Sequence, residues 1–155
     1  MKKIFIFSIM CLFAVFANAQ GWTSDFHEAD ELKGQKAYTC YSFTNETGMF
    51  VFFSDPDDLF KIATFDGFFD YGRYHTTHVI IGLYDEDDKL IDKIDYWIYV
   101  QKDNSSIAFD NGKKPKKVIN YLKQNKGYIR IIADRYGKSS FDFKVPCLDT
   151  HNVSE

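Results

Sequence analysis

Residues 128–134 read YIRIIAD and residues 139–145 read SSFDFKV, and this pair decides the fold class. Every second residue is apolar in both stretches, namely Ile129, Ile131 and Ala133 in the first and Phe141, Phe143 and Val145 in the second. Asp142 and Lys144 fall on the opposite face. Alternation with one polar face is typical of an antiparallel sheet, and the polar residues 135–138 between the stretches predict a hairpin.

The rest of the chain repeats this character. Aromatic and β-branched residues predict further strands over 36–44, 47–54, 60–65, 78–84, 90–100 and 106–110. One helix is expected near 115–126, because Pro115 suits a first turn, Val118, Ile119 and Leu122 have helical spacing, and Gly127 follows. Strands and helices do not alternate. The sequence therefore predicts a mainly β protein, a single-domain antiparallel β-sandwich or small barrel with one short helix.

The N-terminus has the organisation of an export signal. Lys2 and Lys3 precede an apolar run at 4–16, and Ala17-Asn18-Ala19 fits a cleavage site. The run is shorter than the roughly 20 residues of a membrane-spanning helix, which disfavours an uncleaved anchor. We expect a signal peptide at 1–19, a polar arm at 20–35, the sandwich at 36–148 and a tail at 149–155. The protein would then be periplasmic or extracellular, with no membrane span after cleavage.

Two cysteines remain once residues 1–19 are removed. Cys40 and Cys147 form an even set in an exported chain, which predicts a disulfide between them. The alternative is a pair of buried free thiols. The net charge of the whole chain is −3, and the chain has no feature of a nucleic-acid-binding protein.

Aromatic residues mark the candidate binding surface. The stretch FDGFFDYGRYHTTH at 65–78 predicts Phe65 and either Phe68 or Phe69 in the core. On the strand expected at 90–100, Trp97 and Tyr99 share a face opposite Tyr96, Ile98 and Val100. If that face is open, these rings and the polar-tipped loop residues can bind a ligand; otherwise they belong to the core. The predicted ligand-binding residues are Trp97, Tyr99, Tyr71, Tyr74 and Arg73.

Charged clusters have simpler explanations. The acidic stretch at 84–90 lacks the glycine and the later glutamate of a calcium loop, so we interpret it as a solvated turn. His75 and His78 are too few for a tight zinc site. The basic cluster Lys113–Lys117 is either solvated surface or a site for an anionic partner.

No stretch matches a catalytic motif at its full spacing. We therefore expect an exported, non-catalytic binding or interaction module for a protein or a glycan, without cofactor or metal. The alternative is a small secreted glycan hydrolase that uses paired carboxylates.

Export is tested by the N-terminus of the protein isolated from its own host. Mass spectrometry should find Gln20, cyclised or free, or Gly21 as the first residue. Recovery of intact Met1 from the cytoplasm would contradict the prediction.

Overall fold

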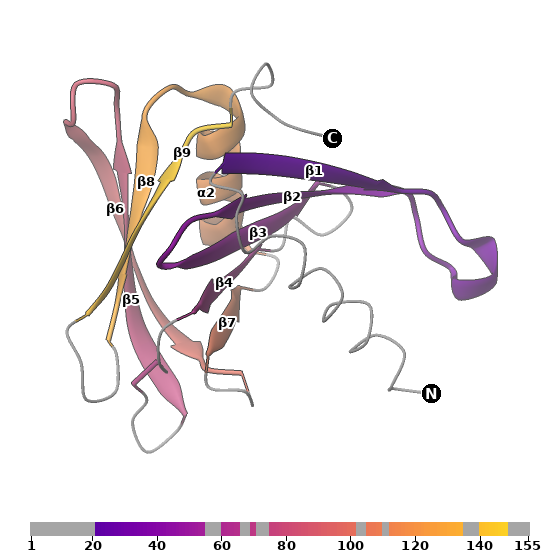
Figure 1. Ribbon diagram of the computed structural model, residues 1–155, viewed down its shortest axis with the longest axis horizontal. Coiled ribbons are helices and arrows are strands. Elements are labelled where there is room, and N and C mark those ends of the chain that lie inside the picture. Colours follow the sequence, from indigo (N-terminus) through magenta and orange to yellow (C-terminus); the bar gives the residue numbers. More distant parts are fainter. Residues whose placement is uncertain are drawn as a thin grey trace.

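The computed structural model describes residues 21–54, 60–65, 69–70, 75–101, 105–109, 112–134 and 140–148. Two antiparallel sheets form a β-sandwich, which confirms the predicted fold class (Figure 1). One sheet has the strand order β1 (Gly21–His27), β2 (Tyr38–Thr44), β3 (Gly48–Ser54), β4 (Phe60–Thr64) and β7 (Ser106–Phe109). The other has the order β6 (Leu90–Tyr99), β5 (Thr76–Tyr84), β8 (Tyr128–Ala133) and β9 (Phe141–Pro146).

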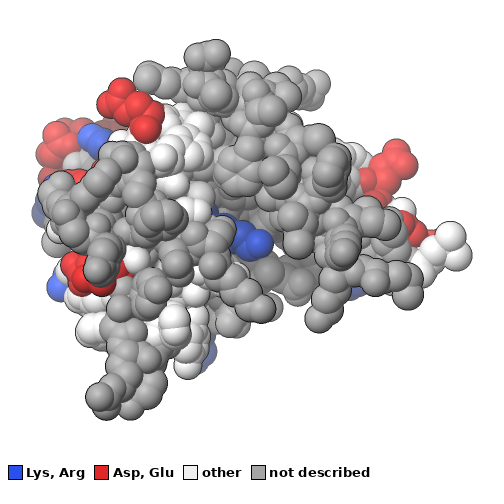
Figure 2. All heavy atoms as spheres, turned by 60° about the horizontal axis from the view of Figure 1, so that its bottom comes forward, with Lys and Arg blue, Asp and Glu red and all other residues white. Residues whose placement is uncertain are grey.

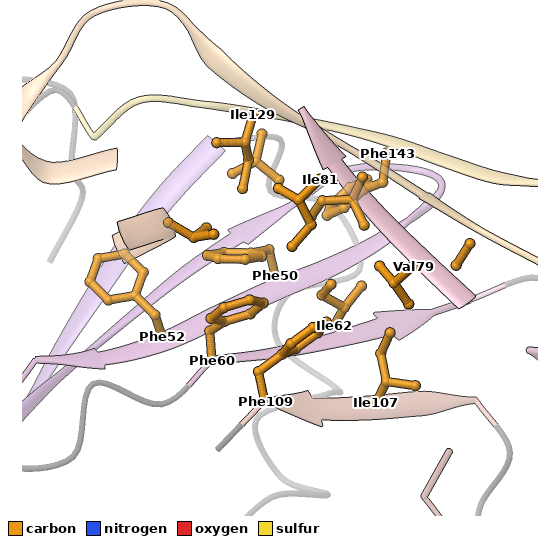
Figure 3. Packing of buried hydrophobic residues seen from close by; sticks show 14 of the residues in the cluster. Phe50, Phe52, Phe60, Ile62, Val79, Ile81, Ile107, Phe109, Ile129 and Phe143 are labelled. Carbon is orange, nitrogen blue, oxygen red and sulfur yellow. The ribbon is translucent and has the colours of Figure 1, made fainter. Parts of the chain in front are cut away.

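The core lies between the two sheets. Figure 3 shows phenylalanine rings of β3, β4 and β7 packed against side chains of β5, β8 and β9. Phe60 and Phe109 stack with ring centroids 4.1 Å apart, and Phe50 lies 5.3 Å from Phe60. The alternation expected in β8 and β9 is confirmed, because the six apolar residues that it places on one face are all buried.

Three contacts close the sandwich. A bridge between Val100 and Ile107 joins the end of β6 to β7. On the opposite side, the Trp22 indole Nε1 donates a hydrogen bond of 3.1 Å to the carbonyl of Pro146. The helix α2 (Lys113–Gln124) covers one end, where its buried residues are Pro115, Val118, Ile119 and Leu122.

The predicted helix is confirmed, and its C-terminal end explains Gly127. This glycine has φ +110°, and a Cβ there would lie 2.2 Å from the Tyr84 carbonyl oxygen. The chain can therefore pass directly from α2 into β8 beside the end of β5 only with glycine at this position. No helix within the described ranges is long and apolar enough to cross a membrane.

The N-terminal segment differs from the polar arm expected at 20–35. Residues 21–27 form β1 at the edge of the five-stranded sheet, and a short 3₁₀ turn, η1 (Glu31–Lys33), follows. Trp22 is only 5% exposed and packs against the rings of Phe43, Phe50 and Phe52. The rest of β1 does not join the core, because the β1–β2 hairpin extends beyond the body of the sandwich, where no second sheet covers it (Figure 1). Even Phe26 is 65% exposed there.

Membership of β1 in the core is tested by Trp22→Ala. The substitution removes three ring contacts and the hydrogen bond to β9, so the free energy of unfolding should fall by about 3–5 kcal/mol in a urea titration. Phe26→Ala is the matched control, because Phe26 lies on the same strand and is 65% exposed. That change should cost less than about 1 kcal/mol. Equal stabilities of the two variants would contradict a core role for β1.

Candidate binding surface

The outer face of the four-stranded sheet carries two exposed aromatic residues. Trp97 is 74% exposed and Tyr99 is 67% exposed. Their neighbours Tyr96 and Ile98 point inward and are half-buried, while Val100 is buried. The alternation expected for this strand is thus observed, and both rings lie on the side away from the core. Their role in binding a ligand stays a prediction.

Register brings a histidine beside Trp97. Antiparallel pairing sets His78 of β5 directly opposite Trp97 of β6. The two rings stack with centroids 5.0 Å apart and planes 24° apart. His78 Nε2 also lies 3.2 Å from an Asp95 carboxylate oxygen, and Lys93 Nζ lies 3.3 Å from the other oxygen. One side of the indole is therefore covered by a ring that an ion-paired carboxylate holds in place.

Asp95 is the centre of this charge cluster. Desolvation raises its pKa, but the ion pair with Lys93 and then the contact with His78 outweigh that effect. The net result is a pKa below the usual value, so Asp95 carries its negative charge at neutral pH. The charges of Lys93 and Asp95 cancel locally.

Paired charges and half-buried side chains continue across the sheet. Arg130 of β8 holds Asp142 of β9 with two hydrogen bonds of 2.8 and 2.5 Å. This pairing lowers the pKa of Asp142 and raises that of Arg130. Between this pair and Asp95 lie Ile80 and Ile132, which face each other on adjacent strands and are half-buried. The four-stranded sheet lies on the left in Figure 1 and stays on the left in Figure 2, where basic and acidic groups lie next to each other.

The basic cluster at the start of α2 is partly used within the fold. Lys117 forms an ion pair with Asp92, and Lys114 Nζ donates a hydrogen bond of 2.9 Å to the Asp95 carbonyl. Lys114 also lies over the ring of Tyr96, 5.3 Å from its centroid. These contacts offset the unfavourable position of lysines in a first helical turn. A shallow depression lies at this junction, lined by Asp92, Lys93, Ile94, Asp95, Lys113, Lys114 and Lys117.

The structure describes only part of the aromatic stretch at 65–78. Phe69 is fully buried and meets Phe141 edge to face at 5.4 Å, as expected for one of the core rings. Phe65 is 47% exposed, so its expected core position is wrong. Burial alternates along β4, with Phe60, Ile62 and Thr64 buried, so residue 65 falls on the outer side. Of the other expected residues, Phe68, Tyr71, Arg73 and Tyr74 lie outside the described residues.

The predicted disulfide is wrong, because Cys40 and Cys147 are both free. Cys40 lies in β2, in register with Asp25 and Phe53, on the outer side of the five-stranded sheet. Cys147 follows β9 in the other sheet, and its thiol points to the Tyr121 carbonyl at 3.8 Å. Desolvation raises both thiol pKa values to about 11, and at Cys40 the charge of Asp25 adds to this effect.

Hydrogen bonds from backbone amides to the Asp85 side chain hold the acidic turn after β5. An Asp85 carboxylate oxygen accepts hydrogen bonds from the amides of Asp87 (3.0 Å) and Lys89 (2.9 Å). Asp88 has φ +60° and lies 3.9 Å from Lys144. This geometry agrees with the interpretation as a solvated turn. In the part of the chain that the structure describes, no three His, Cys, Asp or Glu side chains converge as metal ligands would.

Two parts of this surface were not expected from the sequence. The stacking of His78 on Trp97 and the Arg130–Asp142 pair both depend on cross-strand register. Opposite charges at 130 and 142 in a predicted hairpin were the available clue, since diagonal neighbours on one face can reach each other. In the observed register Arg130 lies opposite Lys144 and Asp142 lies opposite Ile132. His78 and Trp97 lie in strands joined by a longer turn with a bulge, and no residue pattern fixes that register.

Comparison with family models, with curated proteins and with solved structures gives no match to this chain.

The state of the thiols is tested by alkylation without reductant. At pH 8 the raised pKa values leave about a hundredfold less thiolate than an ordinary cysteine has, so both thiols should react slowly in folded protein and fast in urea. Since the unfolded thiols ionise first, stability should be constant below about pH 9 and fall as the pH rises towards 11. Peptide mapping identifies each modified cysteine. A disulfide-linked pair of peptides from unreduced protein would contradict free thiols.

Proposed function

We propose that this protein is an exported, non-catalytic binding module, and that it binds its partner through the Trp97 surface. We use that name for Trp97, Tyr99, Thr76, His78 and Asp95 on the outer face of the four-stranded sheet. The observation that carries the proposal is the 74% exposure of the Trp97 indole, which stacks on a histidine of the neighbouring strand. Aromatic rings with a polar group are enriched at binding interfaces and among their energetic hot spots.

Stability of the fold does not require an indole at this position. The inner face of β6 already contributes Ile94, Tyr96 and Ile98 to the core or its edge. An exposed Trp97 leaves a large apolar surface in water, which becomes favourable only when a partner covers it. Tyr99 adds a second exposed ring on the same face.

Three carboxylates on the four-stranded sheet support binding over hydrolysis. A glycosidase needs one carboxylic acid whose pKa is raised so that it can donate a proton. Asp92, Asp95 and Asp142 instead have lowered pKa values, because lysine, arginine or histidine partners stabilise their charged forms. The two thiols are kept protonated and are poor nucleophiles.

The compartment follows from the first twenty residues. A basic start, a short apolar run and a small-residue site favour cleavage during export. We therefore assign the protein to the periplasm or the exterior, where its partner would be another exported protein or a glycan.

The binding role is tested with Trp97→Ala. Because the side chain lies outside the core, the free energy of unfolding should change by less than about 1 kcal/mol. The variant should lose roughly 2 kcal/mol or more of affinity for a partner, as a hot-spot residue does. Ile91→Ala is the matched control, since Ile91 is 53% exposed on the same strand but outside the Trp97 surface.

Immobilised protein and both variants are incubated with surface extract of the host, and retained proteins and glycans are quantified. The proposal expects material that the wild type and Ile91→Ala retain and Trp97→Ala does not. Equal retention by all three, or a strongly destabilised Trp97→Ala, would refute it.

A further inference from the structure

We infer that the ligand of the Trp97 surface is an uncharged polysaccharide chain. The inference rests on the proposed function and names its ligand class. Four features of the described residues lead to it: the free side of the indole, the balance of charge, the blocked strand edge and the open shape of the face.

The rings are arranged for stacking from one side. His78 covers one side of the Trp97 ring, and the 74% exposure leaves the other side accessible. Tyr99 stands on the same face two residues further, about 7 Å along the strand. Two successive rings on one line can each contact the apolar C–H face of a sugar ring in a chain.

The polar groups offer hydrogen bonds without net charge. Asp95 is paired with Lys93 and His78, and its pKa is below the usual value. A carboxylate has about four acceptor positions and an ammonium group has three donors, so both keep free capacity after pairing with each other. Hydroxyl groups can use that capacity, whereas a charged chain would have to separate the pair. The surface therefore matches a polyhydroxyl ligand with no charge.

The edge of β6 is blocked on both sides of Trp97. On one side Lys114 Nζ is bonded to the Asp95 carbonyl. On the other side the Gln101 amide donates to the Ser106 carbonyl at 2.8 Å, next to the bridge between Val100 and Ile107. A peptide that binds by adding a strand needs a free edge of several residues. Recognition must therefore use side chains on the face of the sheet.

The face around Trp97 is open to solvent, as the exposure of both rings shows. Ile80 and Ile132 lie half-buried beside the surface, and further along β5 the Tyr84 ring covers the buried Gly82. The depression lined by Asp92 and Lys113 lies at the junction with α2 instead. Small molecules need concave sites that enclose most of their surface. An open face with two rings suits an extended polymer.

The experiment measures the mobility of the purified protein in native gels that contain one polysaccharide each. The neutral probes are mannan, xylan, a mixed-linkage β-glucan and dextran, and the acidic probes are alginate and polygalacturonate. We expect at least one neutral probe to retard the wild type, with a dissociation constant that is little changed by 0.5 M NaCl.

Trp97→Ala should weaken this binding at least tenfold, Tyr99→Ala should weaken it measurably, and Ile91→Ala should leave it unchanged. The chain has two tryptophans, and Trp22 is buried, so fluorescence changes on binding report on Trp97. Retardation by acidic probes alone, or binding abolished by salt, would overturn the inference.

The two proposals fail in different ways. If no polysaccharide binds while Trp97→Ala still loses a protein that the wild type retains from host extract, the ligand class is wrong and the binding function stands. If a neutral polysaccharide binds wild type and Trp97→Ala equally, both the ligand class at this surface and the role of Trp97 are wrong.

Discussion

The packing of phenylalanine rings between the sheets is the interaction on which the rest of the structure depends. Phe50, Phe60 and Phe109 come from three adjacent strands, and their rings form a continuous layer under the four-stranded sheet. Because strand side chains alternate, each residue that joins this layer fixes its neighbours on the outside. Burial of Ile94 and Val100, with Tyr96 and Ile98 half-buried between them, therefore turns Trp97 and Tyr99 outward. The core therefore determines where the candidate surface lies, but core packing does not determine which residue types occupy that surface.

The helix and the edge of β6 depend on each other. Four lysines near the positive end of a helix are unfavourable by themselves, and the N-cap residue, Gly112, offers no side-chain cap. Asp92, the Asp95 carbonyl and the ring of Tyr96 provide partners for two of these lysines. The same contacts cover part of an edge strand that would otherwise pair with other chains. One set of contacts thus orients α2 and protects the sheet.

Local pattern was enough to predict most of this fold. The strands from β2 to β9 and the helix follow from alternation, helical spacing and turn residues. β1 was missed because only Trp22 on this strand reaches the core, so its sequence has no period of two to detect. The disulfide was wrong because an even number of cysteines carries no information on which sheet each occupies. Alternation placed Trp97 and Tyr99 on one face of their strand, but it left open whether that face is exposed. The exposure, and the stacking of His78 on Trp97, required the pairing of strands that only the assembled sheet defines.

The hydrogen bond between Trp22 and Pro146 joins residues 124 positions apart. Through Trp22, the first described strand is therefore tied to the last one. Because synthesis starts at the N-terminus, Trp22 cannot form this contact until Pro146 has been synthesised. High contact order of this kind slows folding, because the entropy of closing a long loop is lost before the contact forms. Under the export proposed above, such a delay would keep the chain unfolded until its passage across the membrane is nearly complete.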